Sequence, residues 1–167
     1  VGGVTEQVSA AGNLTDSGVI TFADVELSDV HLVSAIGTPV GTTLGTLSAV
    51  KDADTTGTGA GGQLTWTYTV ADAAVEYLAA GQTKVESFTI TLDDQNGGLI
   101  TKQIDVTITG TNDVALISGT STGAVVEAGG VANATPGTPT VTGTLTDTDV
   151  DNATNTFTTV VAGTGST

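Results

Sequence analysis

Carboxylates dominate the side chains that could do chemistry in this sequence. The 167 residues include 18 Asp and Glu but only 3 Lys and Arg, and the formal net charge is −15. Such a surplus destabilises a compact state by self-repulsion unless cations neutralise it. Divalent cations are the usual agents, and hard oxygen ligands favour Ca²⁺ over softer metals. The composition is therefore typical either of a calcium-binding protein or of a protein that the charge only keeps soluble.

Two acidic stretches have residue spacings that are compatible with a local metal site. Asp52-Ala-Asp54-Thr-Thr-Gly57 resembles the start of an EF-hand loop. However, position twelve is Gln63 instead of the bidentate Glu, so we expect an ordinary loop there. Asp93 and Asp94 precede an Asn-Gly turn, where aspartate can either accept hydrogen bonds from turn amides or bind an ion. Both interpretations stay open.

Other kinds of chemistry have little support. There is no Cys, which excludes disulfides and thiolate metal sites, and the absence of Arg argues against nucleic-acid binding. No apolar run approaches the roughly 20 residues of a membrane helix. The sole histidine, His31, has no neighbouring nucleophile in the sequence, and Trp66 alternates with apolar positions typical of a core. We therefore expect no enzymatic activity.

Alternation of apolar and polar residues predicts the elements that must position the carboxylates. The clearest strands are Leu64–Val70, Phe88–Leu92 and Ile104–Thr109, each with threonines on one face. Weaker alternation predicts strands over 18–22, 31–36 and 43–48. The Asn96-Gly97 pair predicts a hairpin between the second and third clear strands.

A single helical turn is expected near 73–80, where good helix formers precede Gly81. Strands of this number and spacing, without βαβ alternation, indicate an all-β fold. We predict an antiparallel Greek-key β-sandwich.

An internal comparison indicates a repeat. Val4-Thr5-Glu6 is similar to Val125-Val126-Glu127, an offset of 121 residues, and Asp24-Val-Glu26 is similar to Asp149-Val-Asp151, an offset of 125. A repeat of this length is one sandwich domain. We expect one complete domain over 1–113. Residues 114–167 are then the truncated start of a second copy, which we expect to be partly disordered because its opening strands lack their partners.

Four phrases carry a resemblance to a known family. They are Gly18-Val-Ile-Thr-Phe-Ala-Asp24-Val-Glu26-Leu-Ser-Asp29, Trp66-Thr-Tyr-Thr-Val70, Ala74-Val-Glu-Tyr-Leu-Ala-Ala-Gly-Gln-Thr83 and Val106-Thr-Ile-Thr-Gly-Thr-Asn-Asp113. Together they resemble a VCBS-type, cadherin-like tandem repeat of large bacterial surface adhesins and haemolysin-type calcium-binding proteins. The resemblance covers 1–113 and the early part of the second copy. It implies an Ig-like or cadherin-like sandwich, an extracellular location at the bacterial cell surface, type I secretion and stiffening by calcium.

The resemblance also implies a set of calcium ligands. Cadherin-like repeats pool oxygens from an early glutamate, acidic loops and an Asn-Asp linker. The matching residues are Glu6, Asp24, Glu26, Asp93, Asp94, Asn112 and Asp113 in the first copy and Glu127, Asp149 and Asp151 in the second. The linker departs from the cadherin pattern, because Asn112-Asp113 is followed by Val-Ala-Leu instead of Asn and Pro. An ion bound within one domain and an ion shared between domains both remain possible.

These observations predict a non-catalytic, Ca²⁺-stabilised structural repeat of a secreted adhesin. Its expected partners are neighbouring repeats of the same chain. The alternative is an adhesive module that binds host or matrix glycans or proteins through Gly/Thr-rich loops at one end. Neither interpretation involves nucleic acid or a membrane span.

Overall fold

The computed structural model describes residues 1–152, 154 and 156–158, and the chain divides into two units, Val1–Asp113 and Val114–Thr167. All of the described regular structure is β, apart from two short 3₁₀ turns. None of the described helical segments is long or apolar enough to cross a membrane. The first unit contains the strands β1 (Gly2–Thr5), β2 (Asn13–Phe22), β3 (Leu32–Pro39), β4 (Thr46–Ala53), β5 (Gly62–Ala71), β6 (Thr83–Asp93) and β7 (Leu99–Thr109).

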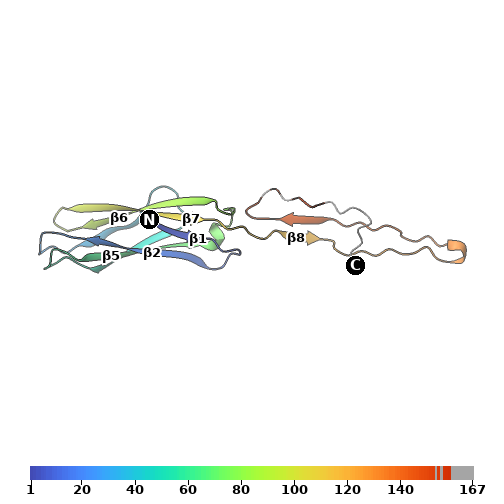
Figure 1. Ribbon diagram of the computed structural model, residues 1–167, viewed down its shortest axis with the longest axis horizontal. Coiled ribbons are helices and arrows are strands. Elements are labelled where there is room, and N and C mark those ends of the chain that lie inside the picture. Colours follow the sequence, from blue (N-terminus) through green and yellow to red (C-terminus); the bar gives the residue numbers. More distant parts are fainter. Residues whose placement is uncertain (153, 155, 159–167) are drawn as a thin grey trace. The chain divides into compact units, whose positions relative to one another are not determined.

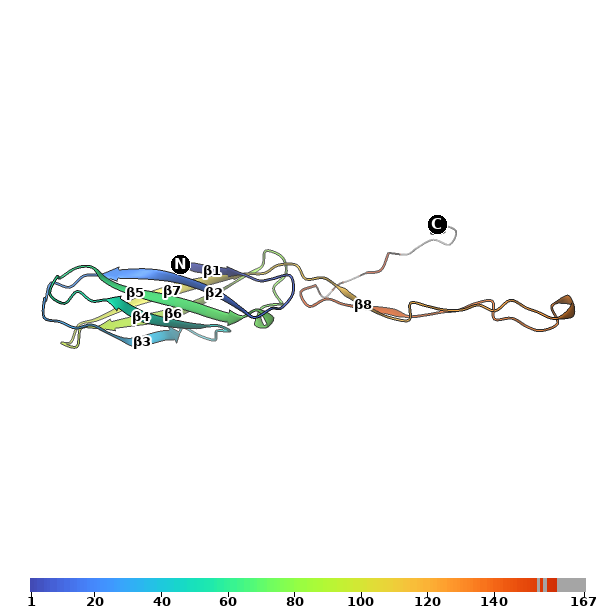
Figure 2. The same cartoon turned by 90° about the horizontal axis from the view of Figure 1, so that it is seen from below.

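Two sheets form the first unit (Figure 1). One has the order β1-β7-β6-β3 and the other the order β2-β5-β4. At the sheet edges β3 lies near β4 and β1 lies near β2, so the larger sheet curls around the core. Figure 2 shows the same strands from below.

The three clearest predicted strands are confirmed and lie at the centre of the fold. Leu64–Val70 belongs to β5, Phe88–Leu92 to β6 and Ile104–Thr109 to β7. Their apolar positions are buried and their threonines face outward, because successive side chains on a strand point to opposite faces. The weaker predictions correspond to β2, β3 and β4, whose observed bounds are longer or shifted.

Both sheets contribute to one hydrophobic core. Trp66 and Tyr68 of β5 face Phe88 of β6 and Val106 of β7, and all four are buried. The Tyr68 and Phe88 ring centroids are 5.7 Å apart in a tilted arrangement. Gly18 gives Trp66 its space, because a Cβ there would lie only 2.6 Å from the indole ring.

The prediction of a purely antiparallel sheet is wrong at β1. Gly2–Thr5 pairs parallel to Val106–Thr109 of β7, whereas the other strand pairs are antiparallel. Alternation identifies a strand but contains no information on the direction of its neighbour, so the sequence could not reveal this pair.

The connections between strands agree with the predicted turns. Asp93–Gly98 closes the β6–β7 hairpin, and the Asp94 amide donates to the Gly98 carbonyl. The expected helical turn is a 3₁₀ turn, η1 (Asp72–Ala74), at the start of the predicted 73–80 segment, and it connects the two sheets.

The second unit has little buried surface among its described residues. Strands β8 (Leu116–Gly119) and β9 (Leu145–Thr148) pair antiparallel, and a 3₁₀ turn, η2 (Val131–Asn133), lies in the connection between them. The side chains of β8 are all exposed. That this unit is an incomplete second copy stays a prediction, and the predicted disorder concerns in part residues outside those described.

Candidate metal sites

Two groups of carboxylates in the first unit have oxygens close enough to hold a metal ion. The Glu6 cluster consists of Glu6, Glu76 and Asp113, and the Asp24 cluster consists of Asp24, Asp29 and Asp94. Within each cluster, one carboxylate oxygen from each residue lies within 4.8 Å of the other two. Acidic groups that can hold a metal ion are therefore present, as the sequence predicted.

Three separate segments position the Glu6 cluster. Glu6 directly follows β1, and its amide donates to the Thr109 carbonyl at the end of β7 over 2.9 Å. The side chain then accepts a 2.8 Å hydrogen bond from the Thr111 amide through Oε2. The Thr111 hydroxyl returns a 2.8 Å bond to the Glu6 carbonyl. These bonds hold the segment leading to Asp113 beside Glu6.

Glu76 enters the Glu6 cluster from the turn after η1. Nearby Asp72, fully buried, accepts hydrogen bonds from the Gln7 and Ala11 amides at 3.2 and 3.1 Å. These bonds hold the connection between β1 and β2 close to Asp72, which directly follows β5. The backbone thus brings together residues 6, 76 and 113, which are far apart in the sequence.

The electrostatics of the Glu6 cluster favour a bound cation. Glu6 and Asp113 are buried, and Glu76 is half-buried. Burial raises the pKa of Glu76, and the carboxylates of Asp113, Glu6 and Asp72 raise it further. Within the part of the chain that the structure describes, the Glu76 Oε1 atom is buried without a hydrogen-bond partner. A divalent cation would both supply that partner and relieve the repulsion.

The donor set of the Glu6 cluster fits calcium. Three carboxylates offer up to six oxygens, and Ca²⁺ takes six to eight at roughly 2.3–2.6 Å from carboxylates, carbonyls and water. There is no sulfur or nitrogen ligand in the cluster, which disfavours zinc and other softer metals.

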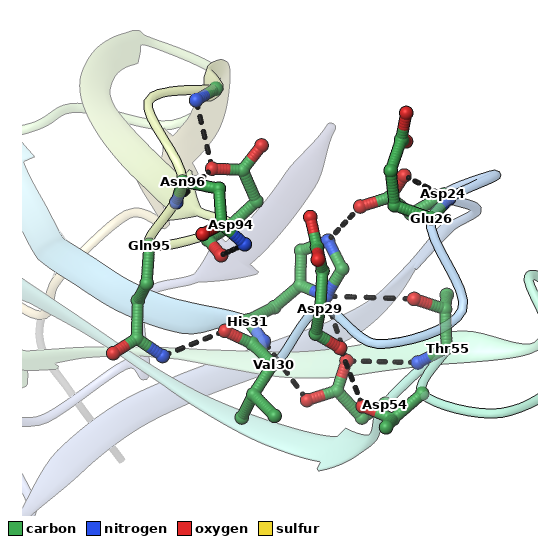
Figure 3. Close-up of polar contacts among 12 residues, drawn as sticks. Asp24, Glu26, Asp29, Val30, His31, Asp54, Thr55, Asp94, Gln95 and Asn96 are labelled. Carbon is green, nitrogen blue, oxygen red and sulfur yellow. Dashed lines mark hydrogen bonds and ion pairs between the residues drawn. The ribbon is translucent and has the colours of Figure 1, made fainter.

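The Asp24 cluster lies at the end of the unit that carries the β6–β7 turn (Figure 3). Asp24 follows β2, Asp29 lies in the β2–β3 connection and Asp94 lies in the turn. Asp24 and Asp94 line a pocket of about 130 Å³ that also includes Phe22 and His31.

Protein groups already engage much of the Asp24 cluster. His31 is buried, and its Nε2 lies 3.0 Å from Asp24 Oδ2. Asp94 Oδ1 accepts hydrogen bonds from the Asn96 and Gly98 amides, both at 2.8 Å, which lower the Asp94 pKa. The turn-bonding interpretation of Asp94 is thus correct, and ion binding by its second oxygen stays a prediction.

Glu26 and Asp93 lie near the Asp24 cluster but do not belong to it. The hydrogen bond between the Glu26 and Asp24 side chains lowers the pKa of Asp24 and raises that of Glu26. Asp93 Oδ1 accepts a 2.7 Å hydrogen bond from the Gln95 amide, which is a turn role.

Behind His31 lies a partly buried polar network that contains Asp54 and Lys51. His31 Nδ1 lies 2.8 Å from Asp54 Oδ1 (Figure 3). Lys51 forms an ion pair with Asp54. Burial alone would raise the pKa of Asp54, but hydrogen bonds from Lys51 and His31 outweigh it and lower the pKa well below its usual range. Asp52 and Ala53 are the end of β4, and the loop that follows them is held by the contacts of Asp54 with Lys51 and His31. Asp54 is not part of either acidic cluster.

The remaining predicted ligands are placed as follows. Asn112 is exposed, and its side-chain amide donates to the Asp113 carbonyl. In the second unit Glu127 is exposed, while Asp149 and Asp151 follow β9 and are half-buried. The ligand roles of these four residues stay predictions.

Sequence reasoning missed two members of the clusters, Asp29 and Glu76. Both lie inside phrases that carried the family resemblance, Asp24–Asp29 and 74–83. Neither was selected, because local spacing does not reveal contacts between residues far apart in the sequence. Glu76 lies close to Glu6, and Asp29 close to Asp94, only in the folded chain.

Comparison of the chain with protein-family models and with curated proteins found no match. The family resemblance therefore depends on the four phrases alone.

Proposed function

We propose that the first unit is a non-catalytic β-sandwich module, Ig-like or cadherin-like in its Greek-key arrangement, that Ca²⁺ stabilises. The observation that supports this most is the Glu6 cluster. Three segments bring their carboxylates within 4.8 Å of one another, where one buried oxygen of Glu76 has no hydrogen-bond partner among the described residues. A fold places carboxylates this close at a cost, unless a cation is bound.

The mechanism that follows is electrostatic. Ca²⁺ binds only where folding has assembled the carboxylates, so binding to the folded state stabilises it by mass action. The gain is about 2.7 kcal/mol when the free ion is at 100 times its Kd. Because Asp113 is the last residue of the first unit, the same ion would also restrain the chain where it leaves the unit.

The wider role is that of a structural repeat. We propose that the module belongs to a secreted tandem-repeat adhesin at the bacterial surface, with neighbouring repeats as its partners and calcium as its stiffening agent. The acidic composition, the all-β fold and the threonine-covered strands support this role. The alternative, glycan or protein binding through the Gly/Thr-rich loop 54–61, gains no support from that loop, which contains no aromatic residue.

Thermal unfolding tests the proposal. We expect the melting temperature of the chain in EDTA to rise on addition of millimolar CaCl₂, and to rise much less with an equal concentration of MgCl₂. The difference is expected because Mg²⁺ demands octahedral geometry and gives up water reluctantly. A melting temperature that is the same in EDTA and in CaCl₂ would overturn the proposal.

A further inference from the structure

The turn between β6 and β7 contains the only Asn-Gly pair of the sequence, Asn96-Gly97. Gly97 has a φ of +109°, in the region that favours glycine, and the turn is closed by the 3.1 Å hydrogen bond from the Asp94 amide to the Gly98 carbonyl. Asn96 and Gly97 are both exposed. The turn therefore explains the glycine, but it also leaves an asparagine side chain and the following backbone nitrogen together in solvent.

An asparagine side chain can react with the backbone nitrogen of the residue that follows it. The nitrogen attacks the side-chain Cγ, a bond forms between these two atoms, and the Cγ–Nδ2 bond breaks. The Nδ2 group leaves as ammonia with the proton of the backbone amide, and a five-membered succinimide ring remains. Water then opens the ring to give either aspartate or isoaspartate, in which the main chain runs through the side-chain carbon. The reaction needs only water, which is one reason why asparagine is a thermolabile residue.

The surroundings of Asn96 favour this reaction. Gly97 has no side chain to hinder its nitrogen, and a Cβ built there would contact nothing within 4 Å. The Gly97 amide also donates to the Asp94 carboxylate, which gives the departing proton an acceptor. The side chain of Asn96 is weakly held, because its Nδ2 donates to the Asp94 carbonyl over a long 3.4 Å (Figure 3). Nucleophile and electrophile are therefore accessible to each other and to water.

Three other asparagines of the described chain offer less favourable pairs. Each is followed by a residue whose side chain hinders the attacking nitrogen. Two of these following residues are buried, and the amide of the third donates to a backbone carbonyl over 3.3 Å. The pairs are Asn13-Leu14, Asn112-Asp113 and Asn133-Ala134. They are internal references for the reactivity of Asn96.

From this geometry we propose that Asn96 is a site of spontaneous deamidation, and that isoaspartate formed there loosens the turn around Asp94. Asp94 Oδ1 accepts hydrogen bonds from the Asn96 and Gly98 amides, both at 2.8 Å. Isoaspartate adds one carbon to the main chain between these two donors, so both bonds cannot keep their lengths. The aspartate product leaves the backbone unchanged and adds a carboxylate to the turn that carries Asp94. This inference does not depend on the proposed calcium function.

Peptide mapping by mass spectrometry tests the site. The full chain is incubated in EDTA at pH 7 and at pH 9 and is digested with trypsin, which releases residues 85–102 as a peptide with Asn96 as its single asparagine. The fraction in which OH has replaced NH₂ is measured against a digest at time zero. We expect Asn96 to deamidate at least about tenfold faster than Asn13, Asn112 or Asn133. The rate should be higher at pH 9, because the backbone nitrogen must lose its proton. Equal rates, or an unmodified Asn96, would overturn the proposal.

A pair of glycine variants tests the role of Gly97. Gly97→Ala should slow the deamidation of Asn96 at least about tenfold, because the new side chain hinders the nitrogen. The matched control is Gly81→Ala, at another exposed glycine with positive φ and no atom within 4 Å of a built Cβ, and it should leave the rate unchanged. Deamidation of Gly97→Ala at the wild-type rate would exclude the succinimide route. The comparison among asparagines of the wild type decides the proposal even if Gly97→Ala does not fold.

Hydrogen exchange tests the effect on the turn. Incubated chain, in which methylation by an isoaspartyl methyltransferase measures the isoaspartate, is compared in EDTA with fresh chain and with Asn96→Asp. We expect the Gly98 amide to exchange faster in the isoaspartate form, because it loses its bond to Asp94. In Asn96→Asp, which adds the charge without the extra carbon, its exchange should stay near that of the fresh chain. Unchanged exchange in the isoaspartate form, or equal acceleration in Asn96→Asp, would contradict loosening by the longer backbone.

Discussion

At Glu76, burial and three neighbouring carboxylates act in the same direction on one titratable group. They raise its pKa, so the folded state binds a proton at Glu76 more tightly than the unfolded chain does. In the absence of metal this contribution to stability is present at low pH and is lost as the pH rises from the ordinary value of 4.5 through the raised value. Above the raised pKa, where Glu76 is ionised, its repulsion by the neighbouring carboxylates is therefore a cost that calcium would offset.

The first prediction concerns Glu76→Gln. The neutral side chain removes repulsion but also removes a ligand oxygen with its charge. In EDTA at pH 7 we expect the melting temperature of the variant to equal or exceed that of the wild type, and in CaCl₂ we expect it to lack the calcium-dependent rise. Asp105→Asn, which removes one negative charge from the outer face of β7, should keep that rise. A variant that gains as much as the wild type from calcium would exclude Glu76 as a ligand.

The second prediction concerns Asp54, whose carboxylate accepts hydrogen bonds from Lys51, from the His31 ring and from the Thr55 amide. Asp54→Asn should lower the free energy of unfolding at pH 7 by roughly 1–3 kcal/mol, since an amide cannot accept all of these bonds. Because the folded pKa of Asp54 is lowered, its stabilisation is present above the ordinary value of 3.8 and is lost as the pH falls below it. Urea unfolding at pH 7 and pH 3 should thus show a difference that shrinks in acid. Asp52→Asn should have a much smaller effect at both pH values, because Asp52 is exposed and accepts one side-chain hydrogen bond, from Thr65, which the asparagine oxygen can still accept.

At the scale of elements, one buried carboxylate connects both sheets. Glu86 of β6 is 1% exposed and accepts a 2.8 Å hydrogen bond from the Tyr68 hydroxyl of β5. It also accepts bonds from the Leu44 and Gly45 amides, at 2.6 and 3.0 Å, in the connection before β4. Burial and the neighbouring Glu86 carboxylate raise the pKa of Tyr68, which keeps the phenol as a donor.

The third prediction follows from this arrangement. Glu86→Gln should lower the free energy of unfolding by roughly 1–3 kcal/mol. The glutamine NH₂ group cannot accept a hydrogen bond, so at least one of the donors that Glu86 now binds would lose its acceptor. Tyr68→Phe removes one donor and leaves the other two in place, so we expect a loss of about 1 kcal/mol. Urea denaturation gives the free energy of unfolding of each variant. A larger loss for Tyr68→Phe than for Glu86→Gln would contradict the prediction.

The elements also show what the sequence could predict. Strands with regular alternation, such as Leu64–Val70, were predictable because their periodicity is a local property. The parallel partner of β1 was not, since four residues around two glycines carry no signal of pairing direction. Likewise Glu6, Asp24 and Asp113 could be selected as acidic residues, but their neighbours Glu76 and Asp29 were missed because only the fold brings them together.

At the scale of the whole molecule, the charge of −15 and the folded first unit are compatible only if carboxylates are spread, hydrogen-bonded or neutralised. The three lysines cannot neutralise 18 acidic residues, and two of them already pair with Asp54 and Glu86. Calcium at the Glu6 cluster would relieve the repulsion among three carboxylates of the first unit. We thus propose that a cation binds at one specific location, the Glu6 cluster, and not merely that an acidic protein has a general affinity for metal ions.

A calcium titration followed by ¹H–¹⁵N NMR of the full chain tests that claim most directly. We predict saturable, EDTA-reversible shifts of the Gln7, Glu76 and Thr111 amides that are absent in the Glu76→Gln variant. If these amides do not respond to millimolar calcium, or respond equally in the variant, the Glu6 cluster is not a calcium site and the account is wrong.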